Sequence, residues 1–221
     1  MTKVDDIPPS AFPLSPSHLI VLSGPSGVGK STVLRSLLSR YPDRLRLSVS
    51  ATTRPPRRGE VEGVDYYFLT PEEFARRREV GEFLESCEVF GRGHWYGTLL
   101  DEVRPSPGDQ KWVILDIDVD GAEKVLSRFP DVPTIFLRPS SDAELERRLR
   151  ARGTESEEAI QRRLEVARRE LARADQYRFQ VVNDTVEQAV GEISHILEQL
   201  DVVGSSERPT SNVQHHTSNP K

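Results

Sequence analysis

The amino-acid sequence predicts an α/β protein in which a mainly parallel sheet is wrapped by helices, with an inserted α+β subdomain and a helical lid. Three observations lead to this prediction. Short apolar runs alternate with helical patterns between His18 and Leu200, as in parallel sheets covered by helices. A glycine-rich loop joins the first apolar run to the first helical pattern. Residues 50–107 and 147–165 depart from the alternation.

The alternation places the main elements in order along the chain. The apolar runs predict strands over 18–23, 45–50, 111–118, 133–137 and 179–183. The helical patterns predict helices over 30–40, 121–129, 142–152 and 185–200. A chain of 221 residues is long enough to bury a sizeable core in one such unit. We therefore expect a single domain over 18–200.

Two segments predict structure outside the main sheet. Residues 50–107 are arginine-rich, then aromatic in "DYYF", and then strand-like around "GEFLESCEVF" and "HWYGT", which indicates an inserted α+β subdomain. Residues 147–165 have helical spacing with a break at Gly153 and Thr154. Such a break predicts two helices joined by a hinge, as a mobile lid needs.

Composition limits the partners and the location of the protein. Residues 1–17 and 201–221 are polar and lack periodicity, so we expect two disordered tails. The formal net charge of −5 argues against a nucleic-acid partner. Cys87 is the single cysteine, so no intrachain disulfide can form. Without a long apolar run or a signal-peptide pattern near Met1, we expect no membrane association and a cytoplasmic protein. Monomer and homodimer both stay open.

The loop "SGPSGVGKST", residues 23–32, matches the phosphate-binding pattern GxxxxGK followed by Ser or Thr. Glycines let successive N–H groups point at an anion, and the following helix presents its positive end. We expect Lys30 to reach the β- and γ-phosphates of a nucleotide and the Ser31 hydroxyl to coordinate Mg²⁺. The predicted polyphosphate-binding residues are Gly24, Pro25, Ser26, Gly27, Val28, Gly29, Lys30, Ser31 and Thr32.

A second candidate anion site lies in the arginine-rich loop. Arg54, Arg57 and Arg58 stand around two prolines that stiffen the loop, and Tyr66 follows. Guanidinium groups held in this way suit the phosphate of a small ligand. Taken alone, such a run is more often a solvated basic loop. The phosphate-binding loop upstream favours a phosphate site here.

Carboxylates follow the apolar run "VIL" of the third predicted strand. Asp116 and Asp118 are two residues apart, which predicts that both side chains face the same side at an edge where open α/β sheets bind ligands. Asp120 is a candidate helix cap. His94 and His195 show no metal-ligand spacing, so we interpret them as surface or loop residues, and Cys87 as a small packing residue.

Seven segments together resemble guanylate kinase, in order and in spacing, over nearly everything between Leu19 and Leu200. They are "GPSGVGKST", "SVSATTRPPRRGEVEGVDYYF", "GEFLE", "YGT", "ILDIDVDGA", "RLRARGTESEEAIQRRL" and "VVND". The resemblance implies a P-loop kinase core, a GMP-binding subdomain and an arginine-bearing lid. It also implies Mg²⁺-dependent transfer of a phosphoryl group from ATP to GMP or dGMP, giving ADP and GDP or dGDP.

By this resemblance, the acceptor nucleotide contacts a set of residues that match the family pattern. The GMP-binding residues implied are Ser50, Arg54, Arg57, Glu60, Tyr66, Glu85, Tyr96, Thr98 and Asp118. Carboxylates facing the guanine N–H groups, with a hydroxyl facing O6, form a complementary set that adenine does not match. The loop "SCEVFGRGHW" is about two residues longer than is usual in the family. Glu82 and Glu88 therefore stay open as alternatives to Glu85.

The resemblance also implies the donor side of the reaction. Asp116 joins Ser31 in holding Mg²⁺, and Asn183 lies beside the adenine of ATP. Arg148, Arg152 and Arg163 match the lid arginines, Arg152 also contacting ATP, while Arg147, Arg150 and Arg162 are interpreted as facing water. The catalytic set implied is Lys30, Arg54, Arg148, Arg152 and Arg163.

Two other functions remain to be distinguished. A non-catalytic domain of the same fold that binds a peptide typically lacks an intact phosphate loop, whereas Lys30 and Ser31 are present here. A P-loop kinase for another small acceptor has no reason to combine Ser50, Tyr66 and Glu85. The sequence therefore favours a guanylate kinase.

Overall fold

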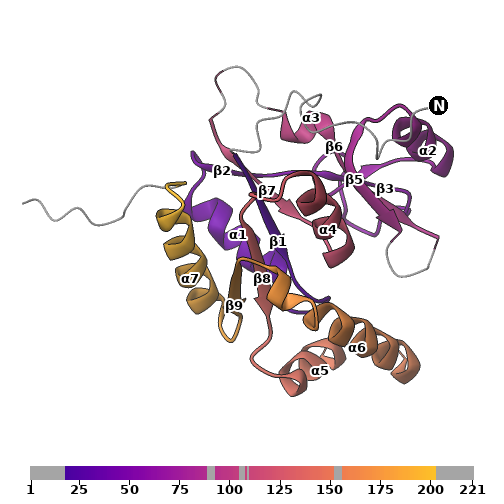
Figure 1. Cartoon of the computed structure of the whole chain (residues 1–221). Helices are drawn as coiled ribbons and strands as arrows, with labels where there is room; N and C mark the ends of the chain where they lie inside the picture. The colour runs from indigo at the N-terminus through magenta and orange to yellow at the C-terminus, as the bar shows by residue number, and fades with distance from the viewer. Residues whose placement is uncertain (1–17, 89–92, 105–107, 109, 152–155, 203–221) are drawn as a thin grey trace, which may run out of the picture.

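A computed structural model describes residues 18–88, 93–104, 108, 110–151 and 156–202 of the chain. Within these residues the strands form a five-stranded sheet in the order β2-β7-β1-β8-β9 and a four-stranded sheet in the order β4-β3-β6-β5 (Figure 1). The first sheet is parallel throughout. Its strands are β1 (Leu19–Ser23), β2 (Leu45–Leu47), β7 (Trp112–Asp116), β8 (Thr134–Arg138) and β9 (Phe179–Val182). The α/β fold expected from the sequence is confirmed.

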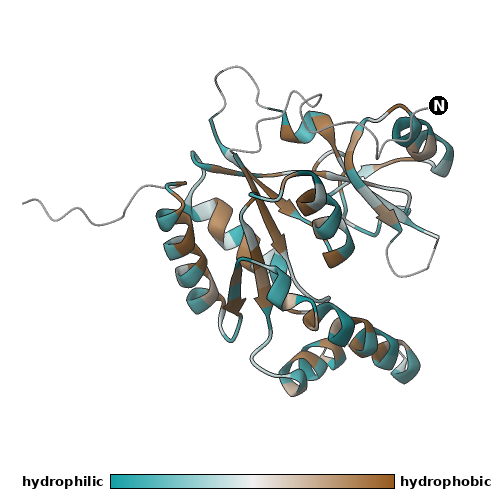
Figure 2. Cartoon of the chain, in the orientation of Figure 1, coloured by the Kyte–Doolittle hydropathy of each residue, from teal (hydrophilic) through white to brown (hydrophobic). Residues whose placement is uncertain are grey.

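Helices cover both faces of the parallel sheet. On one face, α1 (Lys30–Arg40) and α7 (Val186–Gln199) share a core with Ile20 and Leu22 of β1. On the other face, α4 (Val119–Arg128) packs on Leu19 and Val21. Since side chains alternate between faces, a strand buried on both sides must be apolar at every position. This explains the unbroken run "LIVL", and Figure 2 shows the apolar strands at the centre with polar outer helix faces.

The second sheet contains the segment that interrupts the alternation. Its strands are β3 (Ser50–Thr52), β4 (Tyr67–Phe68), β5 (Phe83–Glu88) and β6 (Trp95–Leu99). The helix α2 (Pro71–Glu79) begins after its cap Thr70 and buries Phe74 against Phe83, with ring centroids 4.4 Å apart. The short helix α3 (Leu100–Val103) follows β6. The strand predicted over 45–50 is therefore wrong, because β2 and β3 belong to different sheets and the chain crosses between them at Ser48 and Val49.

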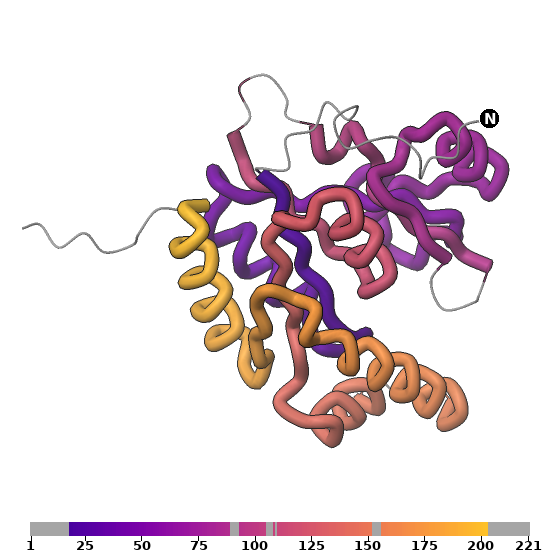
Figure 3. Tube along the Cα trace, viewed as in Figure 1, coloured from indigo at the N-terminus to yellow at the C-terminus, as the bar shows by residue number. Residues whose placement is uncertain are grey.

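Two helices form a separate arm beside the parallel sheet (Figure 3). They are α5 (Asp142–Arg150) and α6 (Glu157–Leu171), and they bury Leu145 and Leu149 against Ile160 and Leu164. The predicted hinge at Gly153 and Thr154 lies outside the described residues. So do Arg152 and both predicted tails, apart from 201–202. The chain returns to the sheet through a 3₁₀ turn, η4 (Ala174–Gln176).

The strand and helix around the two aspartates differ from the prediction. Strand β7 ends at Asp116, and Asp118 is the N-cap of α4, where its side chain accepts the Gly121 N–H at 2.8 Å. The cap is therefore Asp118 and not Asp120. The helix begins at Val119 because this cap satisfies one of its otherwise unpaired first N–H groups.

None of the helices formed by the described residues has the length and apolar character needed to cross a membrane.

Candidate active site

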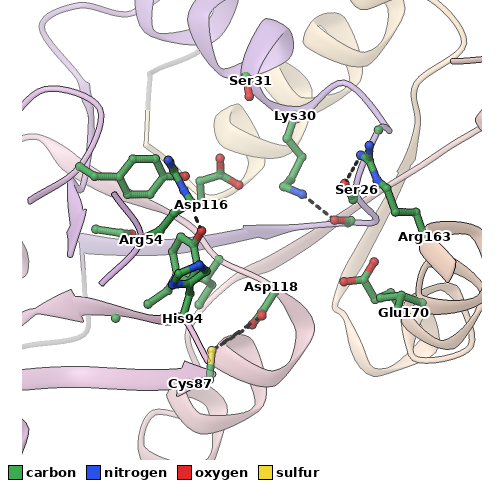
Figure 4. Close-up of a pocket in the computed structure, with 18 of the residues that line it drawn as sticks. Ser26, Lys30, Ser31, Arg54, Cys87, His94, Asp116, Asp118, Arg163 and Glu170 are labelled. Carbon is green, nitrogen blue, oxygen red and sulfur yellow. Dashed lines mark hydrogen bonds between the residues drawn. The ribbon is translucent and has the colours of Figure 1, made fainter. Parts of the chain in front are cut away.

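A cavity of about 1080 Å³ opens between the two sheets and α6 (Figure 4). It lies at the carboxyl ends of β1 and β7, the edge where open parallel sheets bind ligands. Its volume is at the upper end of the range of about 300–1,000 Å³ typical of small-molecule sites. The cavity can therefore hold more than one small ligand at once.

The glycine-rich loop forms one wall of the cavity. Gly24, Gly27 and Gly29 have φ of 148°, 92° and 102°, which side chains rarely adopt. A Cβ on Gly24 would lie 2.2 Å from the Leu137 carbonyl oxygen, so no other residue fits there. Of the described side chains, none caps the N-terminus of α1, which leaves its first N–H groups to an anion. Main-chain amides and a helix end thus make the first anion cradle, defined here as residues 24–31.

Side chains from this loop add one cation and one hydroxyl. The Lys30 Nζ donates a 2.6 Å hydrogen bond to the Gly24 carbonyl and so folds back over the loop. Ser31 and Asp116 both line the cavity near it. Burial raises the pKa of Asp116, while the charge of Lys30 acts in the opposite direction.

The donor set here fits Mg²⁺ and not a metal held by the protein alone. Within the part of the chain that the structure describes, no three His, Cys, Asp or Glu side chains gather as a metal centre. Mg²⁺ prefers oxygen ligands and is commonly bound by one or two protein groups together with substrate phosphates. The Ser31 hydroxyl and the Asp116 carboxylate are such oxygens.

Arg54 is the centre of a second anion cradle, defined here as Arg54, Arg57, Tyr66 and Tyr96. Arg54 is 9 % exposed, and its guanidinium donates to both Glu60 carboxylate oxygens, at 3.0 and 2.8 Å, and to the Tyr96 hydroxyl at 3.1 Å. Its Cζ lies 5.4 Å from the centre of the Tyr66 ring. Burial raises the pKa of Tyr66, so its phenol stays a hydrogen-bond donor.

Glu60 sets the geometry of this cradle. Besides Arg54, its carboxylate accepts the Arg57 backbone N–H at 2.6 Å. The hydrogen bond from Arg54 lowers the pKa of Glu60, which keeps the carboxylate charged. Glu60 therefore holds the Arg54 guanidinium and the Arg57 backbone, and both arginines line the cavity.

An acidic wall stands beyond the second cradle. Glu85 is 5 % exposed, and one of its oxygens accepts the Thr98 N–H at 2.9 Å and the Thr98 hydroxyl at 2.8 Å. Burial, with the nearby charge of Asp118, raises the pKa of Glu85 to about 7, although the Thr98 hydrogen bonds act against the rise. Ser50 is paired opposite Thr98 on the neighbouring strand and also lines the cavity.

The alternatives to Glu85 point elsewhere. Glu82 lies near Arg76 and Arg77 on the surface, 4.0 and 3.8 Å from their nitrogens. Glu88 is exposed and accepts the Gly93 backbone N–H. The structure thus brings Glu85, and not these two, into the cavity. Thr98 is fully buried, and its hydroxyl serves Glu85.

Cys87 and Asp118 complete the acidic wall. The Cys87 thiol donates to Asp118, with sulfur–oxygen distances of 3.5 and 3.7 Å, and burial raises the pKa of the thiol (Figure 4). A Cβ on Gly121 would lie 3.1 Å from a Glu85 oxygen, so a glycine lets the two elements approach closely. Cys87 was expected only to pack, and the structure places it at the cavity wall as well.

The arm of α5 and α6 reaches the glycine-rich loop through arginines. Arg163 donates to the Ser26 hydroxyl at 2.7 Å. Arg148 donates to the Val28 and Asn183 carbonyls at 3.0 and 2.9 Å, so it binds the outer side of the loop. The Asn183 side chain also donates to the Val28 carbonyl, at 2.7 Å.

Four charged cavity residues on α6 were missed. Arg162 was interpreted as facing water but lines the cavity, together with Glu165, Arg169 and Glu170. Their spacing, i, i+3, i+7 and i+8, is that of one helix face, so the 3.6-residue period could have found them. His94, taken as a loop residue, also lines the cavity. Arg147 and Arg150 pair with Glu144 and Glu157 on the exposed outside, as expected.

Glu170 is unusual because it is a buried acid beside a phosphate-type loop. It is 6 % exposed, and among the described residues its Oε2 has no hydrogen-bond partner. Burial raises the pKa of Glu170 to about 7, against the opposing effect of Lys30.

Comparisons with known proteins agree on one family. The model of the guanylate kinase family matches residues 16–200. A guanylate kinase of Rhodopirellula baltica is 52 % identical over 183 residues, covering 82 % of this chain and 88 % of that protein. One from Mycobacterium bovis is 45 % identical, covering 84 % and 88 %. The crystal structure of guanylate kinase from Anaplasma phagocytophilum superposes with a TM-score of 0.63 at 34 % identity, covering 85 % of this chain and 87 % of the other.

Proposed function

The chain belongs to the guanylate kinase family, and on that premise we propose how its cavity performs the reaction of that family. ATP binds at the first anion cradle and GMP, or dGMP, at the second. A phosphate oxygen of GMP attacks the γ-phosphorus, the bond from that phosphorus to the β,γ-bridging oxygen breaks, and ADP and GDP leave. The observation that carries this proposal is that both cradles line one cavity.

On the donor side, the main-chain amides of residues 24–31 surround the β- and γ-phosphates. Lys30 exchanges its bond to the Gly24 carbonyl for phosphate oxygens, which costs little because both partners are acceptors. Asn183 stays on the Val28 carbonyl and keeps the loop in shape beside the adenine. ATP affinity therefore depends chiefly on the loop backbone.

On the acceptor side, Arg54, Arg57, Tyr66 and Tyr96 donate to the phosphate of GMP. All four residues line one cavity, and Glu60 and Tyr96 already hold the Arg54 guanidinium in place, so its binding to the phosphate requires little reordering. The unshared Glu85 oxygen and the Asp118 carboxylate accept from the guanine N1–H and N2–H₂ groups. Adenine presents an acceptor at N1 and no amino group at C2, so it offers no donor to the unshared Glu85 oxygen or to Asp118, and both carboxylates keep only their donors within the chain.

The Ser31 hydroxyl and the Asp116 carboxylate, directly or through water, would hold Mg²⁺ together with the phosphates, and the ion would neutralise phosphate charge. Arg163, which touches Ser26 at the tip of the loop, is within reach of the transferring group. Fixed cations there lower the barrier because charge spreads over the phosphoryl oxygens during transfer. Arg152 completes this set in the proposal, and Arg148 supports it from the outer side of the loop, where it holds the Val28 and Asn183 carbonyls.

The test is the substrate preference of the purified chain. A coupled assay with ATP and Mg²⁺ should show rapid turnover of GMP and dGMP and little turnover of AMP, CMP and UMP. Comparable turnover of AMP and GMP would contradict the role of Glu85 and Asp118. Peptide binding without turnover would favour a non-catalytic domain, and turnover of a different acceptor a different P-loop kinase.

The location and domain boundaries remain predictions. We propose a cytoplasmic protein with one domain over 18–200, an inserted subdomain over 50–107 and a lid over 147–165; the two helices of the arm extend beyond the lid bounds at both ends. Monomer and homodimer are both compatible with this mechanism, because every residue it uses comes from one chain.

A further inference from the structure

Glu102 lies outside the cavity and makes an unusual set of bonds. It is a half-buried residue of α3, on the segment by which the chain leaves the second sheet. One carboxylate oxygen accepts the Val49 backbone N–H at 2.9 Å, and the other accepts the Tyr67 hydroxyl at 2.8 Å. Its own carbonyl oxygen accepts from the Arg46 guanidinium at 2.6 Å.

These three partners belong to three different parts of the chain. Arg46 is on β2 of the parallel sheet. Val49 lies at the crossing, between Ser48, which still bonds to Ile114 of the parallel sheet, and Ser50, which is paired in the second sheet. Tyr67 is on β4, at the edge of the second sheet. Glu102 therefore connects both sheets at the point where the chain passes between them.

Each residue that donates to the Glu102 carboxylate is adjacent in sequence to a cavity residue. Val49 precedes Ser50, and Tyr67 follows Tyr66, while Ser50 and Tyr66 line the cavity. The Val49 bond is made by the backbone N–H directly before Ser50, and the Tyr67 bond by the side chain directly after Tyr66, so each bond restrains the chain beside a cavity residue. The hydrogen bond to Glu102 is also the main cause that raises the pKa of Tyr67, as expected for a close phenol–carboxylate pair.

We propose that Glu102 is a positioning residue for the acceptor site: its carboxylate joins Val49 to Tyr67 and thereby holds Ser50 and Tyr66 in place for GMP. This inference rests on the proposed function. It predicts a selective effect, because the first anion cradle has no contact with Glu102 and ATP should bind as before. A role in stability alone would weaken both nucleotides together.

The test is calorimetric binding of GMP and of ATP, measured separately, to purified variants. Glu102→Gln loses one of the two accepting oxygens, and we expect it to weaken GMP binding about tenfold, as for a bond to a charged group, with ATP binding unchanged. Tyr67→Phe removes one neutral donor and should weaken GMP about threefold. The double variant should lose less GMP affinity than the product of the two single losses, because both changes break the same hydrogen bond.

Asp101→Ala is the matched control. Asp101 is the neighbouring acid on α3, is exposed, and pairs only with Arg104 among the interactions of the described residues, so GMP binding should stay at the wild-type value. The inference would be overturned if wild type binds GMP and both Glu102→Gln and Tyr67→Phe bind it as tightly as Asp101→Ala does. Equal loss of GMP and ATP would overturn it as well. Should Glu102→Gln fail to fold, Tyr67→Phe decides in the same way. A wild-type chain that binds ATP but no GMP would overturn the proposed function itself.

Discussion

At the scale of single residues, Arg54 combines a buried guanidinium with a preset geometry. Glu60 and Tyr96 hold it from two sides, and the Tyr66 ring lies against its face. A neighbouring arginine, Arg58, is exposed and does not appear among the described residues of the cavity wall. Substitutions at Arg54 and at Arg58 therefore distinguish a specific contact with the anion from the general positive charge of the loop.

Arg54→Ala should raise the KM for GMP about 10- to 100-fold and leave the KM for ATP nearly unchanged, because it removes charge-assisted bonds worth about 1.5–3 kcal/mol at the second cradle only. Arg58→Ala should change neither value. Steady-state kinetics with each substrate varied in turn measures both. An equal loss for ATP and GMP in Arg54→Ala would discredit the division into two cradles.

Glu170 makes stability depend on pH in a definite direction. Because burial raises its pKa to about 7 in the folded chain, above the usual 4.5, the folded state favours the neutral acid. Its contribution to the free energy of unfolding is therefore fully present below about pH 4.5 and is lost as the pH rises through about 7. The full difference corresponds to about 3 kcal/mol.

Glu170→Gln should accordingly be as stable as wild type near pH 4.5 and more stable by up to about 3 kcal/mol at pH 8. Urea unfolding across this pH range measures the difference. Glu165→Gln, an exposed position on the same helix, should follow wild type throughout. If the Glu170→Gln and wild-type curves stay parallel, Glu170 does not carry the pH dependence.

Residue types and spacing predicted much of the site but not its buried contacts. The glycine-rich loop is readable from sequence because its geometry needs glycine at fixed positions, as Gly24 shows. Thr98 was assigned to guanine, whereas in the structure its hydroxyl serves Glu85. The helical period places Glu170 on the same face as Arg162, but it does not show that Glu170 is buried, since its burial depends on where α6 meets the loop. Such contacts between distant segments are not encoded in any short motif.

At the scale of elements, the turn from β1 to α1 depends on backbone conformation. Gly24 has φ 148°, and a Cβ would lie 2.2 Å from the backbone oxygen of Leu137 on β8, which cannot move aside. Gly191, within α7, offers the opposite case, because no atom lies within 4 Å of its would-be Cβ. The same substitution should therefore have opposite effects at these positions.

Gly24→Ala should lower the free energy of unfolding and abolish ATP binding, because the loop cannot keep its shape. Gly191→Ala should raise the free energy of unfolding by about 0.5–1 kcal/mol, the difference between Gly and Ala inside a helix, with ATP binding unchanged. Chemical unfolding and ATP calorimetry on both variants test this. Normal ATP binding by Gly24→Ala would show that the loop tolerates a side chain.

The ends of an element were predictable where the apolar spacing and the residues next to the element indicate the same boundary. Helix α1 occupies 30–40 as predicted, because glycine precedes it and the apolar spacing continues to Leu37 and Leu38. The segment 45–50 was mistaken for one strand, since an apolar run does not reveal that the chain changes sheets at Ser48 and Val49. That change is fixed by pairing with β7 on one side and β6 on the other.

At the scale of the whole molecule, two sheets and the α5–α6 arm surround one cavity. The alternation of runs predicted the parallel sheet, and the segments that depart from it predicted a subdomain and a lid, whereas the assignment of the two parts to GMP and to catalysis came from the family resemblance. Transfer between two nucleotides requires that water be excluded from the reacting phosphates. The second sheet and the arm lie beside the parallel sheet and carry residues of the cavity wall, so we expect them to be the parts that close.

ATP analogue and GMP together should therefore reduce the radius of gyration more than either alone, because closure needs contacts from both cradles. Small-angle X-ray scattering with a non-hydrolysable ATP analogue measures this. A radius that is the same with one nucleotide, with both and with none would contradict closure.

The most direct measurement of the central claim is a crystal structure with a bisubstrate analogue, in which adenosine and guanosine are joined by a polyphosphate. We predict that the adenosine end lies along residues 24–31 and that the phosphate next to guanosine lies between Arg54, Tyr66 and Tyr96, with guanine against Glu85. An analogue whose guanosine end lies away from Arg54, with the second cradle empty in the closed chain, would contradict the account.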